Sequence, residues 1–290
     1  MDLVQQILLT ALAGLVIVLV LFFVQSGGIS RTFTSSSSPY FKPTFLILGA
    51  NNAGKTSLFY RFVDDSVPEG KKRPVTPTVS SIEPNITEIE LPFSNNSISR
   101  VYQLVDYPGH LKYFQLFYKL LLEDITLQKV KGIVYVIDSS SQWFNNSENI
   151  EVISKYLFNL FSVTERLQNG VDFLFAVNKN DLFDSVPVHK VKSVLEAEIN
   201  KLIQNELNTV DKQSGIDKSE DDAESDEQYS STIGHESLRE FWLSVIGRPE
   251  NKFTFDQLEG NTDFVAGSVL KNKVETWENW FDEKVVNSNL

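Results

Sequence analysis

The chain has 290 residues, 42% of them hydrophobic, and a formal net charge of −12 at pH 7. This hydrophobic fraction is ordinary for a folded protein, and the negative charge argues against non-specific binding to nucleic acid. The chain contains no cysteine, which excludes disulfides, thiolate nucleophiles and cysteine-containing zinc sites.

Residues 7–24 (ILLTALAGLVIVLVLFFV) form an uncharged apolar run that is long enough to cross a bilayer as a helix. A cleaved secretory signal is the alternative, but the run is long for a signal and no basic segment precedes it. Arg31 and Lys42 follow the run, which favours the cytosol for the rest of the chain. We therefore expect residues 1–25 to be a transmembrane anchor and residues 26–42, which are rich in serine and glycine, to be a flexible tether.

An apolar run at residues 44–48 leads into Gly-x-x-x-x-Gly-Lys-Thr at residues 49–56, and a helix-like pattern follows. This strand–loop–helix context is typical of a P-loop, whose backbone N–H groups surround the phosphates of a nucleotide. We expect Lys55 to reach the β- and γ-phosphates and the Thr56 hydroxyl to ligate Mg²⁺. The residues expected to contact the nucleotide here are Gly49, Asn51, Asn52, Ala53, Gly54, Lys55, Thr56 and Ser57.

Strand-like and helix-like segments alternate after the P-loop. Strands are expected at residues 86–91, 100–105, 131–138, 171–178 and 262–266, and helices at residues 114–122, 150–167, 188–207, 236–246 and 273–285. This alternation predicts a doubly wound α/β domain over residues 43–290, with a mostly parallel sheet and ligands at the carboxyl ends of the strands. Trp277 and Trp280, three residues apart on the closing helix, are interpreted as core residues.

Residues 217–227 carry seven acidic residues and one lysine, which is half of the net charge of the chain. Such a run cannot bury a core. We expect an acidic disordered insertion at about residues 209–232, and an acidic docking segment is the functional alternative.

Two further motifs narrow the choice of nucleotide. Asp106-x-x-Gly109 follows an expected strand, where the aspartate can hold Mg²⁺ and the glycine N–H can contact a γ-phosphate. Asn178-Lys179-Asn180-Asp181 follows another expected strand. A carboxylate there can accept both the N1–H and the 2-amino group of guanine, a pairing that adenine cannot offer. A P-loop kinase or ATPase is the alternative, and this motif disfavours it.

With these motifs in this order, residues 43–290 resemble the small GTPases of the Ras and Arf superfamily. The resemblance implies GTP or GDP with Mg²⁺ as cofactors, and Thr56, Thr78 and Asp106 around the metal. It implies that Asn178, Lys179 and Asp181 recognise guanine. Gly267 and Ser268 resemble the last base-contacting loop, in which Val269 stands where the superfamily has alanine.

His110 stands where most Ras-like proteins have the glutamine that orients the attacking water, so it is the candidate catalytic residue. Two interpretations stay open: His110 orients a water, or it packs or binds a partner while hydrolysis stays negligible. Without an identified arginine finger, intrinsic hydrolysis is expected to be very slow.

The apolar span, the sequence Asp-Tyr-Pro-Gly-His at residues 106–110, and the C-terminal pattern around Phe253–Leu258, Trp277 and Trp280 resemble one branch, the β subunits of the signal recognition particle receptor. In that family the span holds the receptor in the endoplasmic reticulum membrane, and the GTP-bound cytosolic domain captures the N-terminal domain of the receptor α subunit. The resemblance thus implies the α subunit and, through residues 7–24, the lipid bilayer as partners, with the ribosome or the translocon as further candidates.

No direct sequence-specific contact with nucleic acid is expected. An Arf- or Sar-like turnover GTPase of vesicle traffic is the alternative function. A transmembrane span disfavours it, because a span does not release from the membrane. Three N-x-S/T sequons begin at Asn85, Asn95 and Asn145, and on the cytosolic side they are expected to stay unmodified.

Overall fold

The computed structural model describes residues 42–65, 78, 81–95, 100–109, 129–165, 169–214 and 238–287. These residues belong to one compact unit, Lys42–Leu290, of the two into which the chain divides. The expected span at residues 7–24, the tether apart from Lys42, His110 and the acidic run at residues 217–227 lie outside the described residues. Within the described part, no helix is long and apolar enough to cross a membrane.

The strands form one six-stranded sheet in the order β2-β3-β1-β4-β5-β6. Its members are β1 (Thr44–Gly49), β2 (Asn85–Leu91), β3 (Arg100–Asp106), β4 (Val130–Asp138), β5 (Phe173–Asn178) and β6 (Thr262–Ala266). All neighbours are parallel except β2, which pairs antiparallel with β3. The predicted mostly parallel, doubly wound sheet is confirmed. Because the chain winds outward from β1 in both directions, the carboxyl ends of β1, β3 and β4 mark the place where such folds bind ligands.

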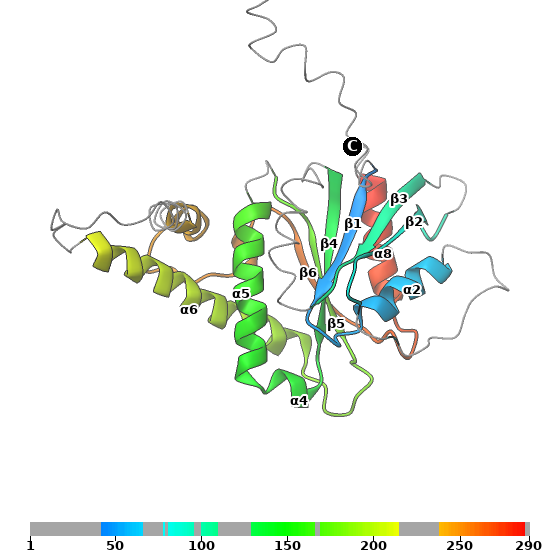
Figure 1. Ribbon diagram of the computed structural model, residues 1–290, viewed down its shortest axis with the longest axis horizontal. Helices are drawn as coiled ribbons and strands as arrows, with labels where there is room; N and C mark the ends of the chain where they lie inside the picture. Colours follow the sequence, from blue (N-terminus) through cyan, green and yellow to red (C-terminus); the bar gives the residue numbers. More distant parts are fainter. Residues whose placement is uncertain are drawn as a thin grey trace, which may run out of the picture. The chain divides into compact units, whose positions relative to one another are not determined.

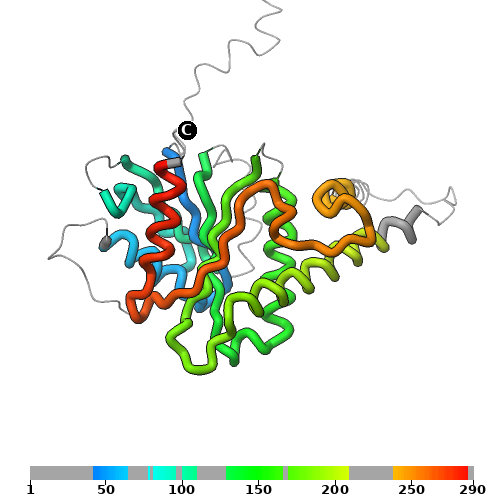
Figure 2. The backbone as a smooth tube through the Cα atoms, turned by 180° about the vertical axis from the view of Figure 1, so that it is seen from behind, coloured from blue at the N-terminus to red at the C-terminus, as the bar shows by residue number. Residues whose placement is uncertain are grey.

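Helices cover both faces of the sheet (Figure 1). They are α2 (Lys55–Asp65), α4 (Ser141–Phe144), α5 (Ser147–Thr164), α6 (Val188–Ser214) and α8 (Glu275–Asn287), with a further helical segment at residues 238–246. Seen from behind in Figure 2, α8 lies on the side of the sheet away from α5. Successive residues of a strand point to opposite faces of the sheet, so β5 contributes side chains to the core on both faces. Leu174 belongs to the core with α2 and α8, whereas Phe173 packs against Phe161 of α5.

The core between the sheet, α2 and α8 is built largely from aromatic rings. Phe281 of α8 lies 4.8 Å from Phe45 of β1 and 4.9 Å from Phe62 of α2, measured between ring centroids. Trp277 and Trp280 are 0% and 5% exposed, so their interpretation as core residues is confirmed.

The turn between β2 and β3 is attached to the same helix α8. Asp282 accepts hydrogen bonds from the backbone N–H groups of Phe93 at 2.6 Å and Ser94 at 2.9 Å. A carboxylate with two backbone donors holds a turn strongly, because charged acceptors form the shorter and stronger hydrogen bonds. The start of the connection after β2, at Phe93 and Ser94, is therefore fixed to α8.

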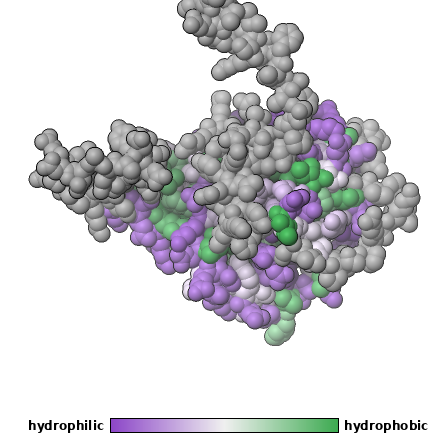
Figure 3. Space-filling view, in the orientation of Figure 1, coloured by the Kyte–Doolittle hydropathy of each residue, from purple (hydrophilic) through white to green (hydrophobic). Residues whose placement is uncertain are grey.

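Helix α6 is longer than the sequence pattern predicts. It runs to Ser214, seven residues beyond Leu207, and so includes residues 209–214 of the segment expected to be a disordered insertion. The added stretch, Asn-Thr-Val-Asp-Lys-Gln-Ser, contains neither proline nor glycine, and the first such residue is Gly215. A helix continues until a breaker or cap ends it, which explains the difference. The outer side of α6 is mainly hydrophilic in Figure 3.

Candidate nucleotide-binding site

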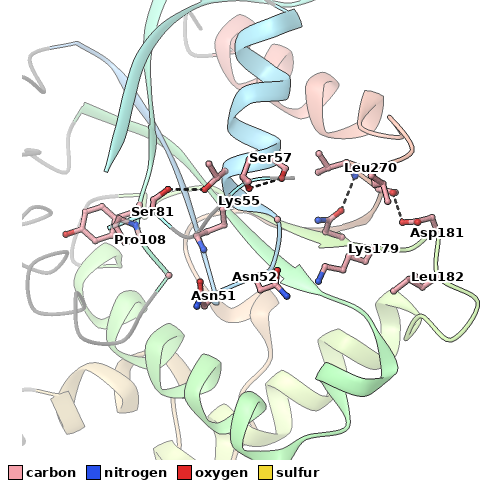
Figure 4. A pocket seen from close by; sticks show the side chains of 18 residues that line it. Asn51, Asn52, Lys55, Ser57, Ser81, Pro108, Lys179, Asp181, Leu182 and Leu270 are labelled. Carbon is pink, nitrogen blue, oxygen red and sulfur yellow. Dashed lines mark hydrogen bonds between the residues drawn. The ribbon is translucent and has the colours of Figure 1, made fainter. Parts of the chain in front are cut away.

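The loops at the carboxyl ends of the strands surround a cavity of about 330 Å³ (Figure 4), a volume in the range of small-molecule sites. From the P-loop and the start of α2, the lining residues are Asn51, Asn52, Gly54, Lys55, Thr56 and Ser57. From the other motifs, they are Thr78, Gly109, Asn178, Lys179, Asp181 and Ser268. Motifs far apart in the sequence thus meet at one cavity.

The remaining assigned residues lie next to the cavity rather than in its lining. Gly49 ends β1, and Ala53 is buried in the P-loop. Asp106 ends β3 and is fully buried. The carbonyl of Gly267 accepts a hydrogen bond from the Asn180 N–H at 3.1 Å, which joins the last loop to the Asn178–Asp181 motif.

At Gly54 the P-loop passes close to the Asn178–Asp181 motif. The φ angle of Gly54 is +100°, and a Cβ on this residue would lie 2.4 Å from Nδ2 of Asn178. Only glycine accepts both the backbone angle and the approach. Helix α2 starts at the next residue, so its N-terminus, which attracts anions, faces the cavity.

Asn178 joins three loops through buried hydrogen bonds. Its Nδ2 donates to the Ala53 carbonyl in the P-loop at 2.8 Å, and its Oδ1 accepts from the Val269 N–H in the last loop at 3.1 Å. Nearby, the Ser268 hydroxyl donates to Oδ1 of Asp181 at 2.6 Å (Figure 4). These contacts place the loop of Gly267 and Ser268 beside the motif that the sequence connects with guanine.

Polar groups from two elements, α2 and β2, converge on Asp106 at the other end of the cavity. The Thr56 hydroxyl donates to its Oδ2 at 2.7 Å, and the Asn85 Nδ2 donates to the same oxygen at 2.9 Å. Burial raises the pKa of Asp106, while these two hydrogen bonds and the Lys55 charge act in the opposite direction. The other oxygen, Oδ1, is buried and has no hydrogen-bond partner among the described residues.

This arrangement fits a magnesium ion. Mg²⁺ is commonly held by one or two carboxylates together with phosphate oxygens and waters, and a serine or threonine hydroxyl completes such sites in P-loop proteins. An unpartnered carboxylate oxygen beside the Thr56 hydroxyl offers the negative charge and the oxygen atoms that the ion requires.

Lys55 is the buried cation of the site. Its Nζ donates to the Ala50 carbonyl at 2.8 Å, and burial lowers its pKa to about 8 against the opposing effect of Asp106. A Cβ on Gly109 would lie 2.4 Å from this nitrogen, so the glycine lets the loop after β3 approach the lysine. An anion in the cavity would compensate the cost of burying the charge.

Thr78 is exposed, as are Asn51 and Asn52 of the P-loop, and its hydroxyl lies 3.2 Å from the Ser57 hydroxyl. His110, the candidate catalytic residue, lies outside the described residues.

The chain matches the family model of the signal recognition particle receptor β subunit over residues 40–261. It is 33% identical over 250 residues to the signal recognition particle receptor subunit beta of Saccharomyces cerevisiae. This alignment covers 84% of this chain and 85% of the yeast protein. The chain belongs to the signal recognition particle receptor β-subunit family. A Dictyostelium discoideum relative with the same description is 23% identical over 284 residues, covering 94% of this chain and 81% of the other.

Solved structures of the receptor share the fold. The mammalian receptor matches with a TM-score of 0.57 and 21% identity, over 83% of this chain and 99% of that chain. The SRb-GTP/SRX complex from Chaetomium thermophilum matches with a TM-score of 0.56 and 20% identity, over 83% and 98% of the two chains. At these identities the likeness concerns the fold, and the predicted small-GTPase fold is confirmed.

Three polar residues at the site were missed by sequence reasoning. Ser81 lines the cavity, and Asn85 contacts Asp106. The buried Asp138, the last residue of β4, forms an ion pair with Lys179. The position of Asp138 at the end of a strand could have indicated that it belongs to the site. For Asn85, the sequence showed only a glycosylation sequon at the start of a strand.

Proposed function

We propose that this chain is the membrane-anchored, GTP-binding subunit of the signal recognition particle receptor. In this proposal it holds the receptor α subunit at the endoplasmic reticulum membrane for co-translational protein targeting, and it does so in the GTP-bound state. Family membership supports the receptor assignment. The observation that carries the nucleotide assignment is the meeting of the P-loop, Asp181 and Ser268 around one cavity.

The described residues supply a role for each part of a guanine nucleotide. The N-terminus of α2 and Lys55 would bind the phosphates, and Thr56 with Asp106 would hold Mg²⁺, which neutralises phosphate charge when it is bound. Asp181 would accept the N1–H and 2-amino hydrogens of the base, while the Ser268 hydroxyl holds one of its carboxylate oxygens. Related solved structures carry these ligands in their descriptions, as the SRb-GTP/SRX and SRb-GDP-Mg complexes.

The dependence on GTP would come from Thr78. This residue is exposed, and Ser57 is the partner that its hydroxyl faces. A γ-phosphate with Mg²⁺ would draw Thr78 inward and order the segment around it, and the ordered surface would capture the N-terminal domain of the α subunit. Residues 7–24 would keep this complex on the bilayer, with the nucleotide-binding domain in the cytosol.

Partner capture in two nucleotide states tests this proposal. The full-length chain in detergent is loaded with GDP or with a non-hydrolysable GTP analogue, and binding of the N-terminal domain of the α subunit is measured. We expect at least tenfold tighter capture with the analogue, as for a typical allosteric coupling. Thr78→Ala should remove this difference and leave GDP affinity unchanged, whereas Thr276→Ala on the exposed start of α8 should change neither. Equal capture in both states would contradict the dependence of α-subunit binding on GTP. The chain would then be an anchor whose partner binding does not depend on the bound nucleotide.

A further inference from the structure

Asn85, the first residue of β2, lies directly beside the proposed metal site. In the antiparallel ladder it is paired with Asp106 of β3, and paired residues place their side chains on the same face. Its Nδ2 lies 2.9 Å from Oδ2 of Asp106 and 2.9 Å from the Ser81 hydroxyl. One amide nitrogen thus connects the segment between Thr78 and β2 to the carboxylate at the end of β3.

The chemistry of the partners fixes the direction of each hydrogen bond. An ionised carboxylate only accepts, so both Thr56 and Asn85 donate to Oδ2 of Asp106. Ser81 accepts from Asn85, which leaves its own hydrogen for the Thr56 oxygen at 3.3 Å. The four side chains therefore form a closed ring of hydrogen bonds in which Asn85 is the double donor and Asp106 the double acceptor.

We propose that Asn85 is a positioning residue for the magnesium site, an inference that rests on the proposed guanine-nucleotide function. By holding Oδ2, Asn85 and Thr56 fix the rotation of the carboxylate and leave the buried Oδ1 free for the ion or its water. Thr56 would hold the cation through its hydroxyl oxygen, and the 3.3 Å contact from Ser81 would then be the one displaced. The contact between Asn85 and Asp106 is independent of that exchange and keeps the carboxylate oriented.

The sequence offers a competing explanation for Asn85, because Asn85-Ile-Thr87 matches the sequon for N-glycosylation. The atom that would carry the glycan is Nδ2, and both of its hydrogens are used inside the ring. Asn145, which also begins a sequon, is exposed, and within the described part of the chain its Nδ2 donates one hydrogen bond, to the Ser141 hydroxyl. The structure thus assigns Asn85 to the metal site and provides Asn145 as a matched control.

Release of a fluorescent GDP analogue from the full-length chain tests the proposal, because Mg²⁺ slows release only through its own site. The release rate is measured in EDTA and over a range of Mg²⁺ concentrations. For Asn85→Ala we expect about a tenfold increase in the Mg²⁺ concentration that gives half of the slowing, as for outer partners of metal ligands. The rate in EDTA should stay within about twofold of the wild type, because the P-loop and base contacts that hold the nucleotide are unchanged. Asn145→Ala should shift neither value.

The other possible results would refute either the positioning role of Asn85 or the proposed guanine-nucleotide function. An unshifted Mg²⁺ dependence in Asn85→Ala, or equal acceleration with and without Mg²⁺, would refute the positioning role, the latter by indicating general loosening of the fold. If Asn85→Ala does not fold, Asn85→Ser, which shortens the side chain and keeps it polar, is measured against the same criteria. A wild-type chain that does not bind the analogue, or releases it independently of Mg²⁺, would refute the proposed function itself.

Discussion

Replacing Asn178 with alanine would remove the hydrogen bonds that join the loops around the candidate nucleotide cavity. Asn178 is 4% exposed, and its amide bonds the Ala53 carbonyl at 2.8 Å and the Val269 N–H at 3.1 Å. Alanine removes both bonds at once. It leaves a carbonyl of the P-loop and an N–H of the last loop without the partner they have in the folded protein.

The expected loss of stability follows from these two groups. A buried polar group left unpaired costs about 1–3 kcal/mol, so two of them would cost about 2–6 kcal/mol. The cavity lies alongside Asn178, and a water entering the space left by the amide would satisfy part of this demand. We therefore expect a loss of about 2–4 kcal/mol in the free energy of unfolding.

Urea unfolding of the unit formed by residues 42–290 measures this loss. Nucleotide is omitted and EDTA is added, because a bound ligand would contribute its own stabilisation. The matched control is Asn159→Ala, a half-buried residue of α5 whose amide donates an exposed hydrogen bond to the Lys155 carbonyl; its expected effect is below about 0.5 kcal/mol. A loss below about 1 kcal/mol in Asn178→Ala would refute the reasoning, since an unpaired buried group costs at least that much.

Two further predictions concern the base and the phosphates. Asp181→Asn should lose at least about tenfold in affinity for GTP and gain affinity for xanthosine triphosphate, because each hydrogen bond to a charged group contributes about 1.5–3 kcal/mol. An unchanged preference in a competition assay would contradict guanine recognition. The pKa of Lys55 falls from 10.5 to about 8 in the fold, so the folded state binds fewer protons than the unfolded state between these values. Without nucleotide, stability should therefore rise by about 2 kcal/mol from about pH 7.5 to about pH 9.5. Lys55→Met should abolish this rise, and an equal rise in that variant would assign it to other groups.

The sheet was predictable because its strands carry the clearest signal in the sequence. β4 and β5 are buried on both faces, so they appear as continuous apolar runs ending in Asp138 and Asn178. The motifs were predictable because each stands at a strand end, where a parallel sheet places its ligands. The contacts between the motifs were not. The two backbone partners of Asn178 lie 125 and 91 positions away, and no local pattern encodes such pairings.

The end of α6 was misjudged for a related reason. The apolar spacing of the helix stops after Leu207, although the backbone continues to Ser214. Apolar spacing reports where a helix packs against the rest of the protein, whereas breakers and caps determine where it ends. A polar final stretch without proline or glycine therefore extends a helix beyond its buried part.

The position of Asn85 beside the proposed metal site follows from the register of one antiparallel pair. Asn85 contacts Asp106 because β2 and β3 pair these two positions, and a slip of one residue would turn the amide to the other face. The hairpin is held at both ends, by the Asn85–Asp106 contact at the cavity and by Asp282 of α8 at the turn. Because α8 also belongs to the core with β1, the C-terminal helix contributes to the register that brings Asn85 to the proposed magnesium site.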